Sequence, residues 1–509
     1  MYSPLRRRLG IIDLGSNSAR LMVAHYSPGW AFKITDELSR RVRLSEGMAA
    51  EQTLHAAAVE RAIETLRMFR AFCAANGVKR ILPVATAAVR DAANQAEFLQ
   101  RVRAETGLKL SVISGEEEAC LGALGAIHAT GLRHGLVLDV GGGSAEVSRV
   151  RAGRFRRGVT SPLGAVRLTE LYLHGERMRA SDVRRLADHI ASTLQMLDWM
   201  KLEKGERFVG LGGTVRALTK IDRELRGYPL GLMNGYELEL ARLDKLVSRL
   251  RELPVSERAR KIPALQPDRA DIILAGAMVV AEAMRRAGAE TLLVSGQGLR
   301  EGLLYREFFG RAEGHAADDL REFAVLNLAR LYGYDTVHAD HVARLALSLF
   351  DQLEGLHGYG RWERECLWAA AQLHDIGMVV DYYDHHKHSA YIILGSGLPG
   401  YSHREIALIA ALCLYHRKGR PALSAAADVF EKGDMERLLR LGACLRLAEY
   451  LDRSRAQAVS GLRVEASGNR VKLTVQAHAR AEANVEVWEA QRNADLFESA
   501  FRRKLEIAL

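Results

Sequence analysis

The chain has 509 residues, of which 48% are hydrophobic, and its formal net charge at pH 7 is +10. This length predicts several domains, and the composition is that of an ordinary soluble protein. The longest apolar stretch, residues 272–281, is too short to cross a bilayer, which excludes a membrane-spanning protein and predicts a buried helix. The 5 cysteines are scattered, which excludes a disulfide framework or zinc ribbon and favours a reducing cytosol. The positive charge favours a polyanionic partner.

A pattern near the N-terminus occurs again in the middle of the chain. Residues 10–20 and 136–146 both fit Asp-x-Gly-x-x-Ser-Ala, each after an apolar run and before a second strand-like run. Each copy predicts a β-hairpin whose turn presents backbone N–H groups to an anion, beside a strand-end aspartate, Asp13 or Asp139. Two copies predict a duplicated architecture, in which two facing turns bind a phosphate chain and its metal between two lobes.

The rest of the first lobe, residues 1–130, alternates strand and helix patterns. Its expected elements are strands at 32–38, 79–86 and 108–113 and a helix at 51–76. This order fits an α/β lobe. Arg90 follows the end of a predicted strand, where α/β sheets usually bind ligands, and its planar side chain suits phosphate. A solvated arginine at the start of a helix is the alternative interpretation.

An acidic segment precedes the second copy of the pattern. Ser114 and Glu117 fit a capping box at the start of a helix, and Glu116, Glu117 and Glu118 all suit the first turn of that helix. A carboxylate between two phosphate-binding turns is also a candidate general base that deprotonates water. The spacing alone does not choose among the three glutamates.

The second lobe, residues 131–308, contains two further glycine loops. Residues 208–214 predict a strand that ends in Gly-Gly-Thr before a helix, and residues 292–302 predict a strand, a Gly-x-Gly loop and a helix. Backbone N–H groups at a helix N-terminus bind anions, so four glycine loops at strand ends predict a phosphate-rich ligand. The P-loop motif and the six-residue dinucleotide fingerprint do not occur, which argues against both nucleotide-binding classes.

These motifs together resemble the exopolyphosphatase / guanosine pentaphosphate phosphohydrolase (Ppx/GppA) family, which shares its fold superfamily with actin and the sugar kinases. The segments that carry the resemblance are Asp13–Ser18, Ser114–Ala119, Asp139–Glu146, Gly212–Thr214 and Ser295–Gly302. The resemblance implies an α/β protein with two actin-like (ribonuclease H-like) lobes and the active site between them. It implies hydrolysis of terminal phosphoanhydride bonds with Mg²⁺ or Mn²⁺ and no organic cofactor.

The resemblance also implies the roles of individual residues. By motif position Glu118 is the catalytic glutamate, and Asp139 and Glu146 hold the metal. The phosphate-binding residues implied are Ser16, Asn17, Ser18, Arg90, Gly141, Gly142, Gly143, Ser144, Gly212, Gly213 and Thr214.

From about residue 315 the chain becomes helical. A histidine, an adjacent His-Asp pair and a distant aspartate resemble the all-α HD phosphohydrolases, so residues 315–455 are expected to form an HD-like domain. The candidate second metal site consists of His341, His374, Asp375 and Asp452. The alternative is a degraded, metal-free domain, which is common in this family. The segment 385–388, with His403, Arg404, Arg417, Lys418 and Arg420, predicts a basic surface that guides polyphosphate.

The last segment, residues 456–509, predicts a small α+β cap. Residues 461–466 and 471–477 read as two strands of a hairpin, and residues 489–507 as one charged amphipathic helix. A homodimer fits the resemblance.

Three functions remain open at the level of sequence. The first is an exopolyphosphatase that releases orthophosphate from inorganic polyphosphate, and the second is a guanosine pentaphosphate phosphohydrolase that uses the same cleft. The third is a phosphate-ligand sensor whose turnover lies in the HD-like domain. A nucleic-acid partner is not expected, because no basic motif with interleaved aromatic residues occurs. The expected location is the cytoplasm, with peripheral membrane association left open.

Overall fold

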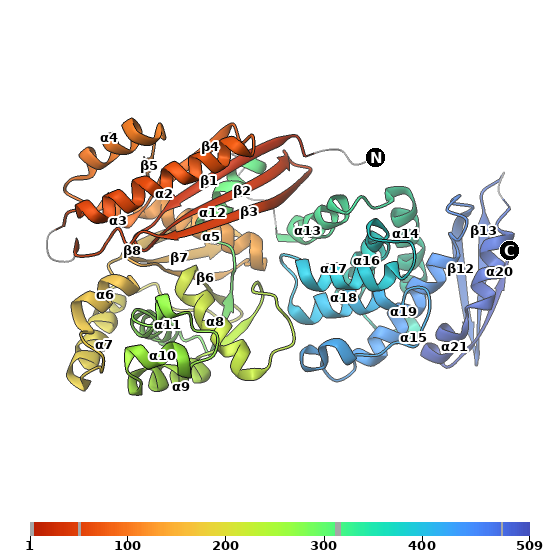
Figure 1. Ribbon diagram of the computed structural model, residues 1–509. Coiled ribbons are helices and arrows are strands. Elements are labelled where there is room, and N and C mark those ends of the chain that lie inside the picture. Colours follow the sequence, from red (N-terminus) through yellow and green to blue (C-terminus); the bar gives the residue numbers. More distant parts are fainter. Residues whose placement is uncertain (1–4, 49–51, 311–316, 480–481) are drawn as a thin grey trace. The chain divides into compact units, whose positions relative to one another are not determined.

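The computed structural model describes residues 5–48, 52–310, 317–479 and 482–509 (Figure 1). The chain forms two compact units. The N-terminal unit comprises Ser3–Tyr228 and Met233–Leu320, and the C-terminal unit comprises chiefly Arg321–Leu509 together with Pro229–Leu232.

The first sheet of the N-terminal unit has five strands in the order β3-β2-β1-β4-β5. They are β1 (Arg7–Leu14), β2 (Ser18–Ser27), β3 (Ala31–Arg41), β4 (Arg80–Ala85) and β5 (Ser111–Val112). β1 to β3 pair antiparallel, whereas β4 and β5 are added parallel through helical crossovers. The predicted hairpin and third strand are therefore confirmed, and the last predicted strand is only 2 residues long.

Among the described residues, four helices belong to this part of the chain: α2 (Ala56–Ala75), α3 (Ala87–Arg90), α4 (Gln95–Thr106) and α5 (Gly115–Thr130). α2 contacts β2 and α3 contacts β4, whereas α5 packs against the second sheet. α2 and α4 lie side by side over the sheet in Figure 1. The predicted helix 51–76 is confirmed as α2, although its expected first residue, Glu51, lies outside the described residues.

The second sheet repeats the strand order of the first and adds one edge strand, in the order β10-β11-β9-β6-β7-β8. Its strands are β6 (Gly135–Val140), β7 (Ala145–Arg151), β8 (Arg154–Ser161), β9 (Arg207–Leu211), β10 (Glu237–Glu239) and β11 (Thr291–Val294). In each sheet three antiparallel strands are followed by two parallel ones. This repetition confirms the duplicated architecture that the sequence predicts.

The second lobe has its own helical layers and core. They are α6 (Ala165–Tyr172), α7 (Ala180–Gln195), α8 (Gly212–Arg226), α9 (Leu240–Glu252), α10 (Val255–Lys261), the 3₁₀ turn η1 (Pro267–Arg269), α11 (Ile273–Ala287) and α12 (Leu299–Phe308). The apolar stretch that excluded a membrane span lies largely in α11, whose Ile273, Leu274 and Val280 are buried in this core. In the described ranges, no helix combines the length and apolar character needed to cross a membrane.

Two helices connect the lobes of the N-terminal unit. α12 packs against α5 and also contacts β1 and β2 of the first sheet. The helices approach closely because glycines stand where they cross: a Cβ on Gly125 would overlap the Gly298 carbonyl, and one on Gly302 would overlap the Leu121 carbonyl. The first turn of α5, which carries the three glutamates, is held in place by this packing.

The C-terminal unit is mainly helical. Its elements are the part of α13 (Ala317–Leu331) from Arg321 on, α14 (Thr336–Gln352), α15 (Glu354–His357), α16 (Arg361–Leu373), η2 (Ile376–Val379), α17 (His385–Ser396), α18 (His403–Tyr415), η3 (Ser424–Val429) and α19 (Asp434–Tyr450). The helices share a buried core with β12 (Val459–Ser467) and β13 (Arg470–Ala477), through Val459, Val471 and Leu473.

The predicted C-terminal hairpin is confirmed, but the single helix expected at 489–507 is wrong. The segment instead contains the end of α20 (Asn484–Arg492), α21 (Asp495–Phe501) and β14 (Lys504–Ala508). Arg502 adopts a left-handed φ of 54°, which ends α21, and β14 then pairs parallel with β13. A strand forms at Lys504–Ala508 because it can pair with the free edge of β13. The charge pattern of residues 489–507 contains no information about that distant edge.

The predicted division into domains 1–130, 131–308, 315–455 and 456–509 stays a prediction. Residue 315, the expected start of the third domain, lies outside the described residues.

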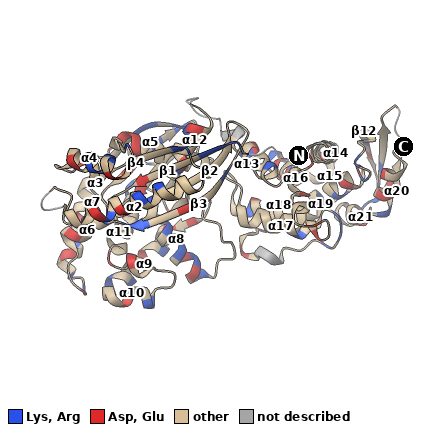
Figure 2. Cartoon of the chain, turned by 45° about the horizontal axis from the view of Figure 1, so that its top comes forward, with Lys and Arg blue, Asp and Glu red and all other residues tan. Residues whose placement is uncertain are grey.

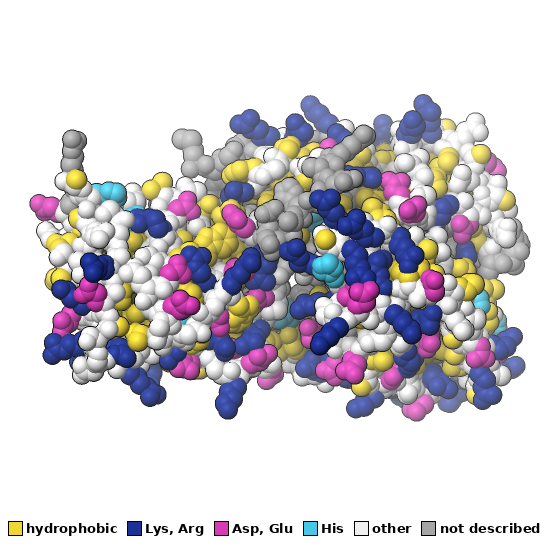
Figure 3. Space-filling view, turned by 180° about the vertical axis from the view of Figure 1, so that it is seen from behind, with side chains coloured by type: hydrophobic (Ala, Val, Ile, Leu, Met, Phe, Trp, Pro, Cys, Tyr) yellow, Lys and Arg dark blue, Asp and Glu magenta, His cyan; other side chains and the backbone are white. Residues whose placement is uncertain are grey.

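The expected basic surface is wrong at several positions. His385, His386 and His403 are buried, because the first turns of α17 and α18 pack into the core. Arg404 donates two hydrogen bonds to the buried Asp434, at 2.9 and 2.8 Å. Basic side chains are instead dispersed along helices and strands of both units, with acidic ones between them (Figures 2 and 3).

Candidate functional site

Two glycine turns of the same geometry lie at the centre of the N-terminal unit. The Gly15 amide donates to the Ser18 carbonyl at 3.1 Å, and the Gly141 amide donates to the Ser144 carbonyl at 3.0 Å. Each turn joins the first two strands of its sheet, so both are fixed at both ends by ladder hydrogen bonds. The predicted turn residues therefore occupy equivalent places in the two lobes.

The two turns face each other at van der Waals distance. A Cβ on Gly142 would lie 3.0 Å from Asn17 Cβ, and one on Gly143 would overlap Ser16 Oγ. Any larger side chain would force the turns apart, which explains the glycines physically. The Asn17 side-chain oxygen is buried and, among the described residues, has no hydrogen-bond partner, as expected of a group placed for a ligand.

The third predicted loop joins the same cavity. Gly212 begins α8 with φ of +93°, a backbone conformation that favours glycine, and a Cβ there would overlap the Asp139 carboxylate. Leu211, the residue before the helix, makes no side-chain cap, so the first N–H groups of this 15-residue helix are available to an anion. Gly213 and the buried Thr214 line the cavity beside it.

Five acidic residues of the described ranges line this cavity, namely Asp13, Glu118, Asp139, Glu146 and Glu301, and the last of them accepts from the Gly298 amide at 2.8 Å. Asp139 and Glu146 stand opposite each other in the β6–β7 ladder and therefore on one face of the sheet. Burial raises the pKa of Asp139 to about 6 and that of Glu118 to about 7. Burial, and then the charges of Glu118 and Asp139, raise the pKa of Glu146 well above its ordinary value.

The Asp139–Glu146 pair fits a hard divalent cation. Both side chains offer oxygen ligands, and their charges repel each other in a largely buried position. Mg²⁺ and Mn²⁺ bind through one or two carboxylates, keeping bound waters, which is a donor set this pair supplies. Thr160 Oγ1 donates to Glu146 Oε1 at 2.8 Å and orients that carboxylate.

The three glutamates in the first turn of α5 have different environments. Ser114 caps the helix by accepting from the Glu117 amide at 3.1 Å, as predicted. Glu116 is exposed, and Glu117 accepts from Arg306 at 3.0 Å. Only Glu118 of the three lines the cavity, with a side chain that is 12% exposed.

Arg90 lies next to Glu118. Arg90 Nη1 donates to Glu118 Oε2 at 2.8 Å and to the Ile113 carbonyl at 3.2 Å. The described lining of the cavity includes Glu118 but not Arg90. In this arrangement Arg90 orients the glutamate, and its expected contact with phosphate stays a prediction.

Sequence reasoning missed the cationic part of the site. Four arginines line the cavity from four separate elements: Arg20, Arg216, Arg269 and Arg300. Burial lowers the pKa of Arg20 to about 10, with the neighbouring charges of Arg216 and Arg300 acting in the same direction. Guanidinium groups forced together in a cavity suit a polyanion. Arg20 and Arg300 had local signals, since Arg20 directly follows the Ser-Ala of the first motif and Arg300 lies within the segment Ser295–Gly302.

The candidate second metal site is only partly assembled as expected. His374 and Asp375 lie together in the C-terminal unit, and Asp452 contacts a different histidine, His338. His341 stands apart: its Nδ1 lies 3.3 Å from Arg344 Nη2, and its Nε2 has no hydrogen-bond partner among the described residues. The residues that do join His374 and Asp375, which the predicted set omits, are His338, His385, His416 and Glu449.

The repeated sheets and the two facing glycine turns define an actin-like α/β protein with a cavity whose lining suits phosphate groups. Comparison with known proteins then gives the family. The model of the Ppx/GppA phosphatase family matches residues 22–309, and the model of Ppx/GppA phosphatase domain III matches residues 320–494. The chain therefore belongs to the Ppx/GppA phosphatase family, whose members are hydrolases.

Solved structures agree with this assignment. A Ppx/GppA family member from Aquifex aeolicus is 29% identical, with a TM-score of 0.52 over 60% of this chain and 99% of its own. Another structure of an Aquifex aeolicus PPX-GPPA enzyme is 30% identical, with a TM-score of 0.50 over 58% of this chain and 98% of its own. An exopolyphosphatase from Cytophaga hutchinsonii, 23% identical, shares the fold with a TM-score of 0.55 over 60% of this chain and 98% of its own.

Proposed function

We propose that the protein is an exopolyphosphatase, which hydrolyses the terminal phosphoanhydride bond of inorganic polyphosphate and releases orthophosphate. The observation that carries the proposal is a group of arginines that continues from the cavity into an adjoining hollow. The cavity between the turns has a volume of about 140 Å³, and an adjoining hollow of about 450 Å³ shares its four arginines and adds Lys220. A polymer of phosphates needs cationic contacts beyond the terminal group, and this second hollow supplies them.

The chemistry of the lining favours an inorganic chain over a nucleotide. Of the described residues, those that line the cavity between the turns include no aromatic side chain to stack on a base. Its volume of about 140 Å³ is below the roughly 300–1,000 Å³ typical of sites for drug-sized ligands. It suits a terminal phosphate, with the rest of the chain along the arginines.

In this proposal the two turns hold the terminal phosphate. Amides of the turns at Gly15–Ser18 and Gly141–Ser144, and of the α8 N-terminus at Gly212, donate to its oxygens. The arginines bind the anionic oxygens of the rest of the polyphosphate chain. Asp139 and Glu146 would hold the Mg²⁺ or Mn²⁺ ion, which would supply further charge neutralisation when bound.

Glu118 acts as the general base. Its pKa of about 7, raised by burial against the opposing effect of Arg90, suits proton transfer near neutral pH. Water attacks the terminal phosphorus while Glu118 accepts one of its protons. The bond to the bridging oxygen breaks, and its electron pair stays on the shortened chain.

The test compares Glu118→Gln with Glu116→Gln, since Glu116 is exposed in the same helical turn. With Mg²⁺ and long-chain polyphosphate, we expect Glu118→Gln to lower kcat by about 10² to 10⁴, the usual contribution of a general base. Glu116→Gln should stay near wild type, and polyphosphate affinity should survive in both variants.

Equal loss of binding and turnover in Glu118→Gln would contradict the general-base role. Guanosine pentaphosphate is assayed in parallel. A higher kcat/KM for this nucleotide than for polyphosphate would overturn the proposed substrate, although it would leave the site intact.

A further inference from the structure

Four histidines in the C-terminal unit point their Nε2 atoms toward one another; we call them the histidine cluster, and they are His338, His374, His385 and His416. They come from α14, the C-terminal end of α16, the start of α17 and the C-terminal end of α18. All four side chains are at most 3% exposed. Of these four, only His374 belongs to the set of residues that the sequence predicts for a second metal site.

The second ring nitrogen of each histidine fixes its tautomer. Nδ1 of His374, His385 and His416 each lies 2.7 Å from the backbone carbonyl three residues earlier. Nδ1 of His338 lies 2.7 Å from Asp452 Oδ2. Carbonyl and carboxylate oxygens only accept, so each Nδ1 carries a proton, and in a neutral ring Nε2 then presents a lone pair.

The Nε2 atoms of the histidine cluster lie so close together in pairs that an ion or a proton is needed between them. Nε2 of His338 lies 3.3 Å from Nε2 of His374, and Nε2 of His385 lies 3.3 Å from Nε2 of His416. In neutral rings these facing lone pairs repel, because neither nitrogen then has a hydrogen to donate. Two nitrogens bound at about 2.0–2.1 Å to one tetrahedral ion would be separated by about 3.3–3.4 Å.

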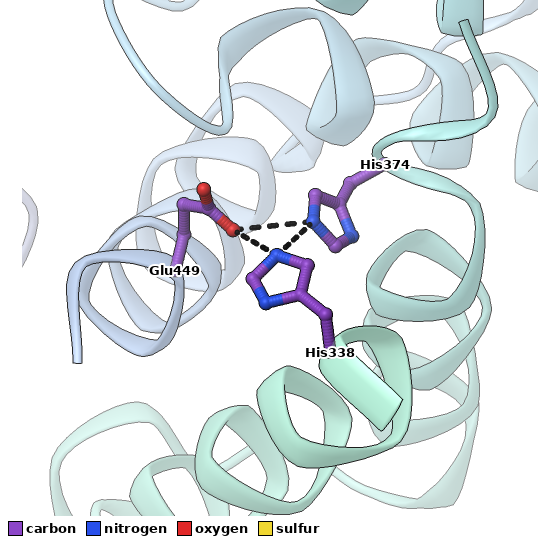
Figure 4. A group of neighbouring side chains, drawn as sticks. All are labelled: His338, His374 and Glu449. Carbon is purple, nitrogen blue, oxygen red and sulfur yellow. Dashed lines mark hydrogen bonds and ion pairs between the residues drawn. The ribbon is translucent and has the colours of Figure 1, made fainter. Parts of the chain in front are cut away.

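Two carboxylates complete the donor set. Glu449 Oε2 lies 3.1 Å from Nε2 of both His338 and His374 (Figure 4). Asp375 Oδ1 lies 3.1 Å from His385 Nε2 and 3.7 Å from Nε2 of His374 and His416. Yet Asp375 Oδ1 is buried and, in the part of the chain that the structure describes, accepts no hydrogen bond of adequate geometry. Oδ2 of the same carboxylate accepts from Arg455 Nη2, whereas Oδ1 faces the Nε2 atoms of the histidine cluster without a donor among the described residues.

We propose that the histidine cluster, with Glu449 and Asp375, binds divalent first-row transition metal ions of the Zn²⁺, Mn²⁺ or Fe²⁺ class. Imidazole nitrogens select such ions over Mg²⁺, which prefers oxygen. Asp452 and the backbone carbonyls orient the ligands through the far ring nitrogens. Because the ligating side chains are at most 8% exposed, the site is closed, and its metal stabilises the helical unit.

The ligand set differs from the one that the sequence predicts, and the difference provides a matched control. His338 and His341 are both buried on α14, three residues apart, but only His338 contacts the cluster. His338→Gln should remove a ligand, whereas His341→Gln should leave the metal in place. His416→Gln tests the same site from α18, should His338→Gln fail to fold.

The experiment measures metal content and thermal stability of the full-length protein. After chelation and reconstitution with Zn²⁺ or Co²⁺, wild type and His341→Gln should retain metal, and Co²⁺ should show ligand-field absorption typical of nitrogen ligands. His338→Gln and His416→Gln should retain at least about tenfold less. Metal should raise the Tm of wild type by several degrees, and chelation should lower it.

A protonated cluster is the competing explanation, since a proton on His338 would satisfy Glu449 without a metal. Wild type that binds neither ion, with a Tm unchanged by metal and chelator, would overturn the proposal. Equal metal loss in His341→Gln would overturn the assigned ligands. A Glu146→Gln background excludes metal held in the phosphate cleft as the source of the signal.

Discussion

The two hairpins of the N-terminal unit have nearly the same backbone and opposite electrostatics. In both, an aspartate ends the first strand and the turn closes with the same amide-to-carbonyl hydrogen bond. Asp13 stands opposite Arg20 in the first ladder, whereas Asp139 stands opposite Glu146 in the second. The residue opposite the aspartate is therefore the main difference between the two hairpins. In the first it is an arginine, which neutralises the aspartate, and in the second it is another acid.

This difference separates the tasks of the two lobes. The first hairpin, with its cation, suits direct contact with phosphate oxygens, because Arg20 also belongs to the adjoining cationic hollow. The second hairpin, with paired carboxylates, suits a divalent cation. A substitution of Arg20 therefore tests the proposed contact with phosphate, and a substitution of Glu146 tests the proposed metal site.

The largest effect is expected from Glu146→Gln, which leaves Asp139 without its acidic partner. Activity with Mg²⁺ should fall by about 10² or more, and the Mg²⁺ concentration needed for half-maximal rate should rise. Thr160→Val keeps the carboxylate but removes the hydrogen bond that orients it, so its loss should be nearer tenfold. Steady-state rates over a Mg²⁺ titration measure both. An unchanged Mg²⁺ requirement in Glu146→Gln would contradict the metal-binding role of the second hairpin.

A smaller effect is expected from Arg20→Gln in the first hairpin. Removing this charge should raise KM for long-chain polyphosphate by about tenfold while kcat changes by no more than about twofold. Arg103→Gln, an exposed arginine on α4, is the control for net charge. A fall in kcat with no change in KM would mean that Arg20 acts on the reaction itself and not on chain binding.

The smallest effect concerns stability. Asp139 and Glu118 have folded-state pKa values of about 6 and about 7, above their ordinary values of 3.8 and 4.5, chiefly through burial. The folded state therefore binds more protons than the unfolded state, and stability falls as pH rises from about 4 to about 7. In chelator, the Tm assigned to the N-terminal unit should drop across this range by a few degrees.

Two additions sharpen this measurement. Mg²⁺ should restore the lost Tm at neutral pH, because a bound cation favours the ionised carboxylates. Glu146→Gln should show a shallower decline, since it removes a charge from the group. A wild-type Tm that rises with pH over the same range would contradict the raised pKa values.

Much of the site could be predicted because its information is local. Glycine, serine and aspartate at fixed spacing after an apolar strand specify a hairpin turn wherever they occur, and Ser114 caps α5 through a neighbour three residues on. The same locality explains the failures. Residues 489–507 have a helical charge pattern, but a strand forms there because an edge of β13 is available. Four arginines from β2, η1, α8 and α12 meet only when both lobes are folded.

The sequence by itself determined the duplicated motifs, the two glycine turns and the family resemblance, since each depends on residues close together in the chain. Only the tertiary structure decided which histidine of α14 joins the histidine cluster, and it placed Glu118, the glutamate that the family motif implies, at the cavity. Residues three apart on a helix are separated by most of a turn, so spacing leaves several candidates in reach. The packing of α5 against α12, and of α14 against α16 and α19, sets the rotation of each helix and so makes the choice.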